Sequence, residues 1–381
     1  MSYSITQAPG VYNLTSSLRD IVITSDEDLT IKIYFAYFYQ TETPGDLLII
    51  EEVYTPDNDG KIYIRDVGKL IRNYLYGSGF TAETHNLIFA QFKLEINGTD
   101  TDLYNILCCD AISRIEPVNF TLGNVFLHNM KPVKWIIPTS KEYKTVFLSA
   151  TNSRKVEVFL TTFDGQNYTN TDKVTLTTSA TDVIKTIDVS FDVIRAIFPA
   201  VDPDSIVAYR LVLPEEIAVY MIDREHYILP LQFRFLNVFN VPETIVTRGD
   251  VVRKGISTFE KSRISHVDRK FNVERSDEFA VNSGKIFSPH DYDRYAELFN
   301  SEDVEILFSG EWKKVIVTED DSSVSLRAGS LNQKSFTFTF ADPNDNNIIL
   351  GESFFRWILS GGTWIDNNMW IDAGQWNDNP T

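Results

Sequence analysis

Short runs in which apolar and polar residues alternate recur along the whole chain. Alternation with a period of two turns one face of an extended segment toward a core and the other toward solvent, so each run predicts a strand. Turn sequences such as PDNDG at 56–60 and FDGQN at 163–167 separate the runs. The predicted strands are 29–38, 46–54, 86–96, 155–163, 205–213, 232–239 and 335–341. The chain is therefore expected to be mainly β.

The helical patterns are few and short. The first begins after Asp66, a residue type that caps helix N-termini, and is expected to end at Gly77. The second, in IDVSFDVIRAIFP, stops before Pro199, and the third, in SPHDYDRYAELF, has Ser288 as cap and Pro289 at its first position. The apolar stripes are Val67, Leu70, Ile71, Tyr74 and Leu75 in the first helix and Val189, Val193, Ile194 and Ile197 in the second.

The first two helical segments resemble each other. DVGKLIRNYL aligns with DVSFDVIRAIF after one inserted residue, so that Ile71 matches Ile194, and each helix precedes two strands. A weaker third copy follows the same plan, although amphipathic helices can also resemble each other by chance. The expected architecture is three tandem β-sandwich-like domains, each with one short helix, followed by a Trp-rich appendage. The expected boundaries are 1–116, 117–230, 231–345 and 346–381.

Composition and charge narrow the class of protein. The chain is 43% hydrophobic and 13% aromatic, which is typical of a globular protein with much β structure. Its formal charge is −18, from 53 acidic and 35 basic residues, and we expect it to repel nucleic acid. Solubility alone is a sufficient reason for such a charge.

The two cysteines are neighbours, Cys108 and Cys109. Neighbours in a strand point to opposite faces, so these two are not expected to bond each other, and the lack of a usable disulfide favours folding in a reducing cytoplasm. The start of the sequence lacks the pattern of a signal peptide, and no apolar run reaches the length of a membrane span. We therefore expect no contact with a membrane.

Catalytic and metal-binding patterns are not recognisable. His85, His128, His226, His266 and His290 are scattered and are expected to be surface or loop residues, and no nucleophile elbow or phosphate-binding glycine loop occurs. Asp342, Asn344 and Asn346 begin like a calcium loop, but its later required positions are wrong. We expect no enzyme, no cofactor and no metal. The alternative is a carbohydrate hydrolase, which would need two of the many carboxylates close together in a cleft.

The last segment is rich in tryptophan. Trp364, Trp370 and Trp376 are six residues apart, and Trp357 precedes them. Indole rings on a segment too short for its own core can pack on the parent domain, enter a neighbouring subunit or stack on sugar rings. We predict that Trp357, Trp364, Trp370 and Trp376 bind a partner.

Three stretches carry a resemblance to a known family. ITQAPGVYNLTSSLRDIVITSD, leading through GKIYIRDVGKLIRNYL, resembles the N-terminal domain of tail structural proteins encoded by phages and prophages of Bacteroidetes, the crAss-like gut phages included. QFRFLNVFNVPETI, DYDRYAELFNS, DVEILF and WKKVIVTED before SFTFTFADP are similar to the later β domain of those proteins. These motifs cover most of 1–345, and the tryptophan segment falls outside them.

The resemblance implies a structural virion protein of the tail, the baseplate or the portal-tail connection, folded in the host cytoplasm before assembly. The implied partners are other virion subunits and further copies of this chain, in a ring or an adaptor. The alternative is a receptor- or glycan-binding tail protein that uses the Trp repeat on a surface glycan. A host surface lipoprotein that captures polysaccharide is a further alternative, and it would need an export signal.

Overall fold

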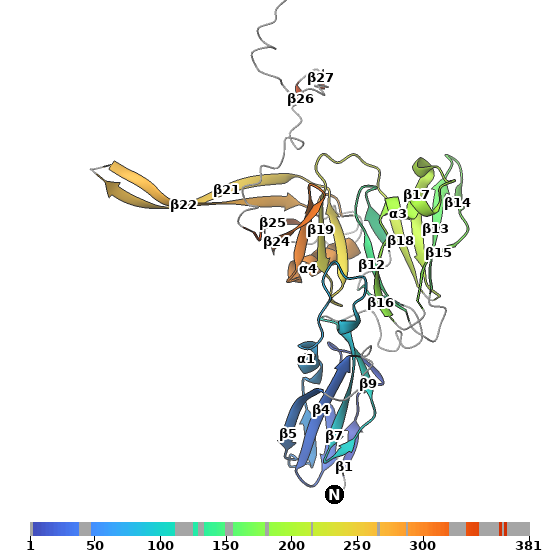
Figure 1. The fold of residues 1–381 in the computed structure, drawn as a ribbon, viewed down its shortest axis with the longest axis vertical. Helices are drawn as coiled ribbons and strands as arrows, with labels where there is room; N and C mark the ends of the chain where they lie inside the picture. Colours follow the sequence, from blue (N-terminus) through green and yellow to red (C-terminus); the bar gives the residue numbers. More distant parts are fainter. Residues whose placement is uncertain are drawn as a thin grey trace, which may run out of the picture.

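The computed structural model describes residues 3–37, 47–110, 125–128, 133–148, 155–179, 183–214, 216–264, 267–286, 289–319, 333–342, 358–359 and 362–363. Within these residues the chain is mainly β, as the alternation predicts, with several sheets and three α-helices. Three clusters of buried apolar residues define three units, which Figure 1 shows as a lower unit beneath two upper ones.

The first unit has two sheets on either side of one core. Its elements are β1 (Tyr3–Gln7), β2 (Tyr12–Leu14), β3 (Ile21–Ser25), β4 (Leu29–Tyr37), β5 (Leu47–Tyr54), β6 (Lys61–Ile64), α1 (Val67–Arg72), the 3-10 helix η1 (Asn86–Ile88), β7 (Phe89–Ile96), β8 (Thr99–Asp100) and β9 (Tyr104–Leu107). One sheet has the order β1-β3-β6 and the other β2-β9-β7-β4-β5, with β8 beside β7. Both sheets contribute to the first core cluster, for example through Ile23 and Phe92.

The second unit is built in the same way. Its elements are β10 (Val125–Phe126), β11 (Val133–Ile136), β12 (Tyr143–Leu148), β13 (Lys155–Phe163), β14 (Tyr168–Asn170), β15 (Val174–Thr178), β16 (Val183–Asp188), α3 (Phe191–Ile197), η2 (Pro203–Ser205), β17 (Ile206–Val212) and β18 (Ile217–Ile222). Its sheets have the orders β10-β12-β16 and β11-β18-β17-β13-β14, with β15 beside β13.

The first two units share one topology in the main strands of both sheets, and only the additional strands β8 and β15 differ in place. The first strand of the larger sheet is parallel to the last in both units, β2 to β9 and β11 to β18. The helix follows the last strand of the smaller sheet in both, and the matched residues Ile71 and Ile194 are each 0% exposed. The sequence similarity between these two segments therefore corresponds to a repeated fold.

The third unit has a different topology. Its elements are β19 (Leu231–Leu236), β20 (Pro242–Thr247), β21 (Val251–Ile264), β22 (Val267–Asn282), α4 (Pro289–Asn300), β23 (Val304–Phe308), β24 (Glu311–Glu319) and β25 (Ser335–Phe340). Its strands form a single sheet in the order β20-β19-β23-β24-β25-β22-β21, and Tyr295 and Leu298 of α4 lie in its core. Separately, β26 (Ile358–Leu359) pairs with β27 (Gly362–Thr363).

Two predicted elements end earlier than expected. The first helix stops at Arg72, and Asp66 does not cap it, because its backbone is left-handed at φ 56° and its carboxylate pairs instead with Lys69 at 2.8 Å. The strand predicted at 232–239 stops at Leu236, because Asn237 begins a tight turn. The side-chain oxygen of Asn237 accepts the Phe239 N–H at 2.9 Å, and Asn240 has φ 60°.

This turn locks the third unit into the first. Phe239 and Val241 are 0% exposed and belong to the core cluster of the first unit. The Asp110 N–H donates to the Val238 carbonyl at 2.7 Å. Gly77 lies so close to the Asn240 carbonyl that a Cβ at this position would collide with it. This close approach, and not the predicted end of the helix, explains why a glycine occupies the position.

The second unit joins the same junction. Its residues Leu127, Phe147 and Ile184 also belong to the first core cluster. The His85 N–H donates to the Ile184 carbonyl at 2.9 Å, so a segment of the first unit continues beside β16 of the second. All three units therefore share buried contacts and form one body.

Candidate functional site: a two-stranded arm

The most exposed part of the third unit is a long hairpin. Strands β21 and β22 pair from Val251 opposite Val281 to Ile264 opposite Val267, whereas β22 pairs with β25 only over its last four residues. Residues 254–264 and 267–278 therefore form a two-stranded ribbon, which we call the arm. At the usual rise of a strand, it extends roughly 35 Å beyond the sheet. Figure 1 shows the arm pointing away from the body.

The arm forms because its residues favour an extended backbone while neither face is apolar enough to enter a core. Its charged residues occupy both phases of the alternation, from Arg253 and Lys254 to Arg269 and Lys270. A ribbon that is polar on both faces has no core to cover it. A bulge between Thr258 and Glu260 adds twist, and the twist is visible in Figure 1.

An ion pair fixes the base of the arm to the body. Asp277 of β22 is 0% exposed and forms an ion pair with Arg253 of β21. The neighbouring Phe279 lies in the core of the third unit, where its ring stacks on Phe338 at 4.9 Å between ring centroids. The arm therefore leaves a well-packed sheet.

Basic side chains gather at the outer end of the arm, residues 259–264 and 267–270. Four Lys and Arg residues occur in these ten positions, against two Asp and Glu. Lys261 lies directly opposite Lys270, an arrangement of like charges that destabilises an isolated strand pair. Both ammonium groups lie near the Phe259 ring, at 5.7 and 4.0 Å from its centroid. The ion pair of Arg263 with Asp268 is long, at 3.6 Å, and exposed.

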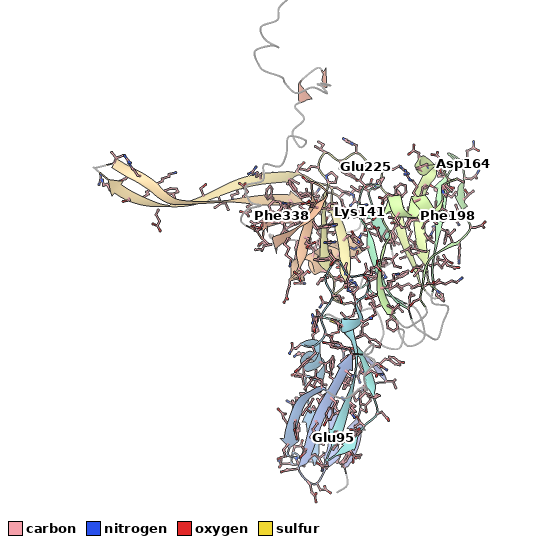
Figure 2. The ribbon with its side chains drawn as sticks, viewed as in Figure 1. Glu95, Lys141, Asp164, Phe198, Glu225 and Phe338 are labelled. Carbon is pink, nitrogen blue, oxygen red and sulfur yellow. The ribbon has the colours of Figure 1, made fainter. Side chains whose placement is uncertain are left out.

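Apolar side chains accompany these charges. Ile256 is 39% exposed, Phe259 37% and Val267 59%. Figure 2 shows side chains projecting from the ribbon on both sides, with no other helix or strand of the described residues beside its outer part. A two-stranded hairpin by itself is only marginally stable in water. The arm thus exposes both cationic and apolar groups that a partner surface would cover.

A second polar cluster, between the second and third units, is buried. The ammonium group of Lys134 lies 2.6 Å from Glu142 and 3.0 Å from Glu243, and it donates to the Thr244 carbonyl at 2.6 Å. Burial by itself would raise the pKa of Glu243, but Lys134, Lys144 and Arg294 outweigh it and hold that pKa well below its usual value. Burial lowers the pKa of Lys144 to about 8.

Three of the cations that line the hollow beside this cluster have carboxylates close to them. Lys134, Arg248, Lys285, Arg294 and Tyr295 help to line it. Lys134 is paired as described, Arg248 lies 3.0 Å from Asp223, and Arg294 lies 3.9 Å from Glu243. This balance favours a structural cluster that joins two units over a site for an anionic ligand.

The residues considered for catalysis lie apart. Cys108 and Cys109 are free thiols, as predicted, and burial raises the pKa of Cys108. His85 and His128 lie in loops but are buried, at 0% and 2% exposure, whereas His226 is exposed. In the part of the chain that the structure describes, no three His, Cys, Asp or Glu side chains are grouped as metal ligands. None of the described helices is both long and apolar enough to cross a membrane.

The predicted partner-binding tryptophans, Trp357, Trp364, Trp370 and Trp376, lie outside the described residues, as do Asn344, Asn346 and Ser288. The arm, by contrast, was missed by the sequence analysis, because its alternation is weak. The sequence feature that could have indicated the arm is the high density of Lys and Arg among Val, Ile, Phe and Thr over residues 251–282.

No family model matches this chain, and no curated protein matches it.

Proposed function

We propose that this chain is a structural subunit of a phage virion, in the tail, the baseplate or the portal-tail connection, which assembles through subunit interfaces into a ring or an adaptor. The observation that carries the assembly role is the arm, a ribbon roughly 35 Å long that leaves a packed sheet and has no other described element of the chain beside it. The assignment to a virion rests on the family resemblance of the sequence.

The body has the properties that such a subunit needs. The turn carrying Phe239 is buried in the first unit, and the Lys134 cluster joins the second unit to the third. Shared buried contacts of this kind oppose rotation of one unit against another. A rigid body lets a projecting arm hold a partner at a fixed distance and angle.

We propose that the units are three tandem β-sandwich-like domains with the boundaries given above. Two facing sheets around one core support this for the first two. In the third, Phe233 of β19 lies 5.5 Å from Phe336 of β25 between ring centroids, although two strands separate them in the sheet. A flat sheet would hold those backbones roughly 14 Å apart. The close rings favour a sheet that curls around its own core.

The proposal extends to partners and location. The partners are other virion subunits and further copies of this chain, and the protein folds in the host cytoplasm before it enters the virion. No cofactor or catalytic reaction is part of this function. The Trp-rich segment 346–381 is proposed as a second anchoring element, through Trp357, Trp364, Trp370 and Trp376.

Trimming the arm tests the assembly role. Replacing residues 256–276 by Asn-Gly joins Gly255 to Asp277, which face each other in the hairpin, and keeps the ion pair of Arg253 with Asp277. We expect an unchanged thermal midpoint and loss of assembly, measured by sedimentation velocity alone and with other virion proteins. The control is a hairpin in the second unit, where Asn-Gly replaces residues 164–167. Unchanged assembly of the trimmed chain would contradict the proposal.

The glycan-binding alternative predicts a different result. A tail protein that uses its Trp repeat on sugar would keep its assembly and lose binding to a glycan array on Trp370→Ala. Loss of assembly with that substitution, and no glycan signal from the wild type, favours the structural role.

A further inference from the structure

We infer that the outer end of the arm binds the acidic free end of the first unit in a second copy of this chain. This inference rests on the proposed assembly function and names the partner of the arm. It follows from three observations: the charge of the two surfaces, their separation within one molecule, and the apolar groups among the charges of the arm.

The free end of the first unit is formed by three adjacent connections. The Ser25 N–H donates to the Gly60 carbonyl at 2.9 Å, and the Thr30 N–H donates to the side-chain oxygen of Asn97 at 2.8 Å. These bonds bring together the segments 26–28, 55–60 and 97–100. Their exposed acidic residues are Asp26, Glu27, Asp28, Asp57, Asp59 and Asp100. We call this set the acidic end.

Positive charge near the acidic end is sparse. Lys93 pairs with Asp100 at 2.6 Å. Over residues 1–110 the sequence has 16 Asp and Glu against 7 Lys and Arg, so this stretch carries half of the net charge of −18. The outer end of the arm has the opposite balance, with four basic and two acidic residues. Opposite potentials steer two surfaces together and fix their orientation.

The two surfaces cannot meet within one molecule. Glu95 lies near the free end of the first unit, whereas the arm leaves the third unit at the other end of the body and runs out to the side (Figures 1 and 2). A contact between them therefore joins two copies. Because each copy has one arm and one acidic end, the contact is head-to-tail, and such contacts produce rings when the rotation closes and filaments when it does not.

The composition of the arm favours a protein partner over nucleic acid. Glu260 and Asp268 lie among its basic residues, and phosphates would repel both carboxylates as well as the acidic body. Ile256, Phe259 and Val267 are exposed beside the charges, and apolar groups of this kind are covered in protein interfaces. On the acceptor, Val53 of the edge strand β5 lies opposite Thr30, next to the acidic end, and is 67% exposed.

A charge exchange between two variants tests the contact. The donor variant is Lys261→Glu with Lys270→Glu, and the acceptor variant is Asp26→Lys with Asp28→Lys. Neither acceptor residue is among those whose side chains hold the turn, unlike Asp57, which accepts two backbone N–H groups. A matched control is Lys69→Glu with Lys173→Glu, which reverses two exposed charges elsewhere.

We expect the wild type to self-associate, more weakly as salt is raised, and each of the two test variants alone to associate at least about tenfold more weakly. An equimolar mixture of the two should recover association, because each arm then meets an end of opposite charge. The control should behave like the wild type. Sedimentation velocity measures association, and circular dichroism with a thermal scan shows that every variant folds.

Several outcomes would overturn the inference. If the acceptor variant associates normally, or the mixture shows no recovery, the acidic end is not the partner. The proposed function then still stands, provided that trimming the arm abolishes assembly with virion proteins. A wild type that stays monomeric also overturns the inference. Binding of duplex DNA by the wild type that is lost in the donor variant would assign the arm to nucleic acid.

Discussion

The body and the arm are built from the same β structure, yet their surroundings differ completely. In the body, Phe239 of the third unit is 0% exposed within the core of the first. In the arm, Phe259 is 37% exposed, and two lysines of its own ribbon approach its ring. Phe239 therefore stabilises the fold, whereas Phe259 stays partly exposed on the arm.

The charged residues show the same contrast. Lys134 has two carboxylates and a carbonyl around it in a buried cluster, whereas Lys261 lies opposite another lysine at the surface. Removing a charge from the cluster leaves its partners buried and uncompensated, which is strongly unfavourable. Removing a charge from the arm changes only an exposed interaction. Stability and assembly should therefore respond to different substitutions.

The largest expected loss of stability is at the turn between units. Phe239→Ala should lower the free energy of unfolding by about 3–5 kcal/mol, because it leaves a cavity where three units meet. Urea denaturation followed by circular dichroism measures the change. Phe163→Ala, at the half-buried end of β13, is the matched control and should have a much smaller effect. Equal losses at the two sites would show that the turn does not join the units.

The buried ion cluster should give the next largest effect. Glu243→Gln removes a carboxylate from Lys134 while keeping the shape of the side chain, and we expect a loss of about 3 kcal/mol. The comparison is Glu157→Gln, which breaks a partly exposed pair with Lys155 and should cost less than about 1 kcal/mol. If the two variants unfold at the same urea concentration, the cluster contributes no more than a surface pair.

The contact between the first two units should depend on pH through His85. Burial lowers the pKa of His85 to about 4 from its ordinary 6.5, so the unfolded chain binds the extra proton first as the pH falls. The contribution of neutral, buried His85 to the free energy of unfolding is fully present above about pH 6.5 and is lost as the pH falls toward 4. The loss reaches about 2 kcal/mol by pH 5.

The measurement compares two chains. Urea unfolding of the wild type and of His85→Gln at pH 7 and pH 5 isolates the histidine, because every other titrating group is common to both. The wild type should lose about 2 kcal/mol more than the variant. Parallel pH dependence of the two would mean that His85 is protonated in the folded chain without cost.

The smallest effect on stability is expected in the arm. Lys261→Ala should change the free energy of unfolding by less than about 0.5 kcal/mol, because it removes an exposed side chain and relieves a like-charge pair. Its effect should appear in self-association instead. A large destabilisation, seen by thermal unfolding, would show that the arm packs against the body.

The backbone of the arm should also exchange its amide hydrogens faster than that of β19. Amides in a ribbon without covering side chains exchange through small local openings, whereas those of β19 lie in the middle of a packed sheet. Exchange followed by mass spectrometry compares the two strands directly. Slowing of the arm amides as the protein concentration rises would mark the arm as an interface.

Particular elements show how far the sequence could predict this fold. The predicted strands at 155–163 and 335–341 match β13 and β25 within one residue, and the turn glycines Gly60 and Gly165 have positive φ as their motifs require. The match of Ile71 with Ile194 also corresponds to two units of the same topology. These features depend on residues close together in the chain, so local patterns are enough.

Other features could not be predicted in this way. The strand pattern at 232–239 correctly marks Phe239 as apolar, but alternation says only that a side chain is buried and not which core buries it. The arm was missed for a different reason, because alternation marks only those segments that have an apolar face. Residues 254–278 have no apolar face, so they give no burial signal although they form the longest strands among those that the structure describes.

The sequence by itself determined the mainly β character, the places of the three helices, the lack of a bond between Cys108 and Cys109, and the repeat of the first two units. Only the tertiary structure decided that Phe239 joins the third unit to the first, that carboxylates surround Lys134, and that β21 and β22 leave the sheet as an arm. The physical reason is the distance along the chain over which each effect acts. Propensity and alternation act between residues that are neighbours in the chain. The contacts of Phe239 and Lys134 join residues about a hundred positions apart, and the arm depends on where the sheet ends.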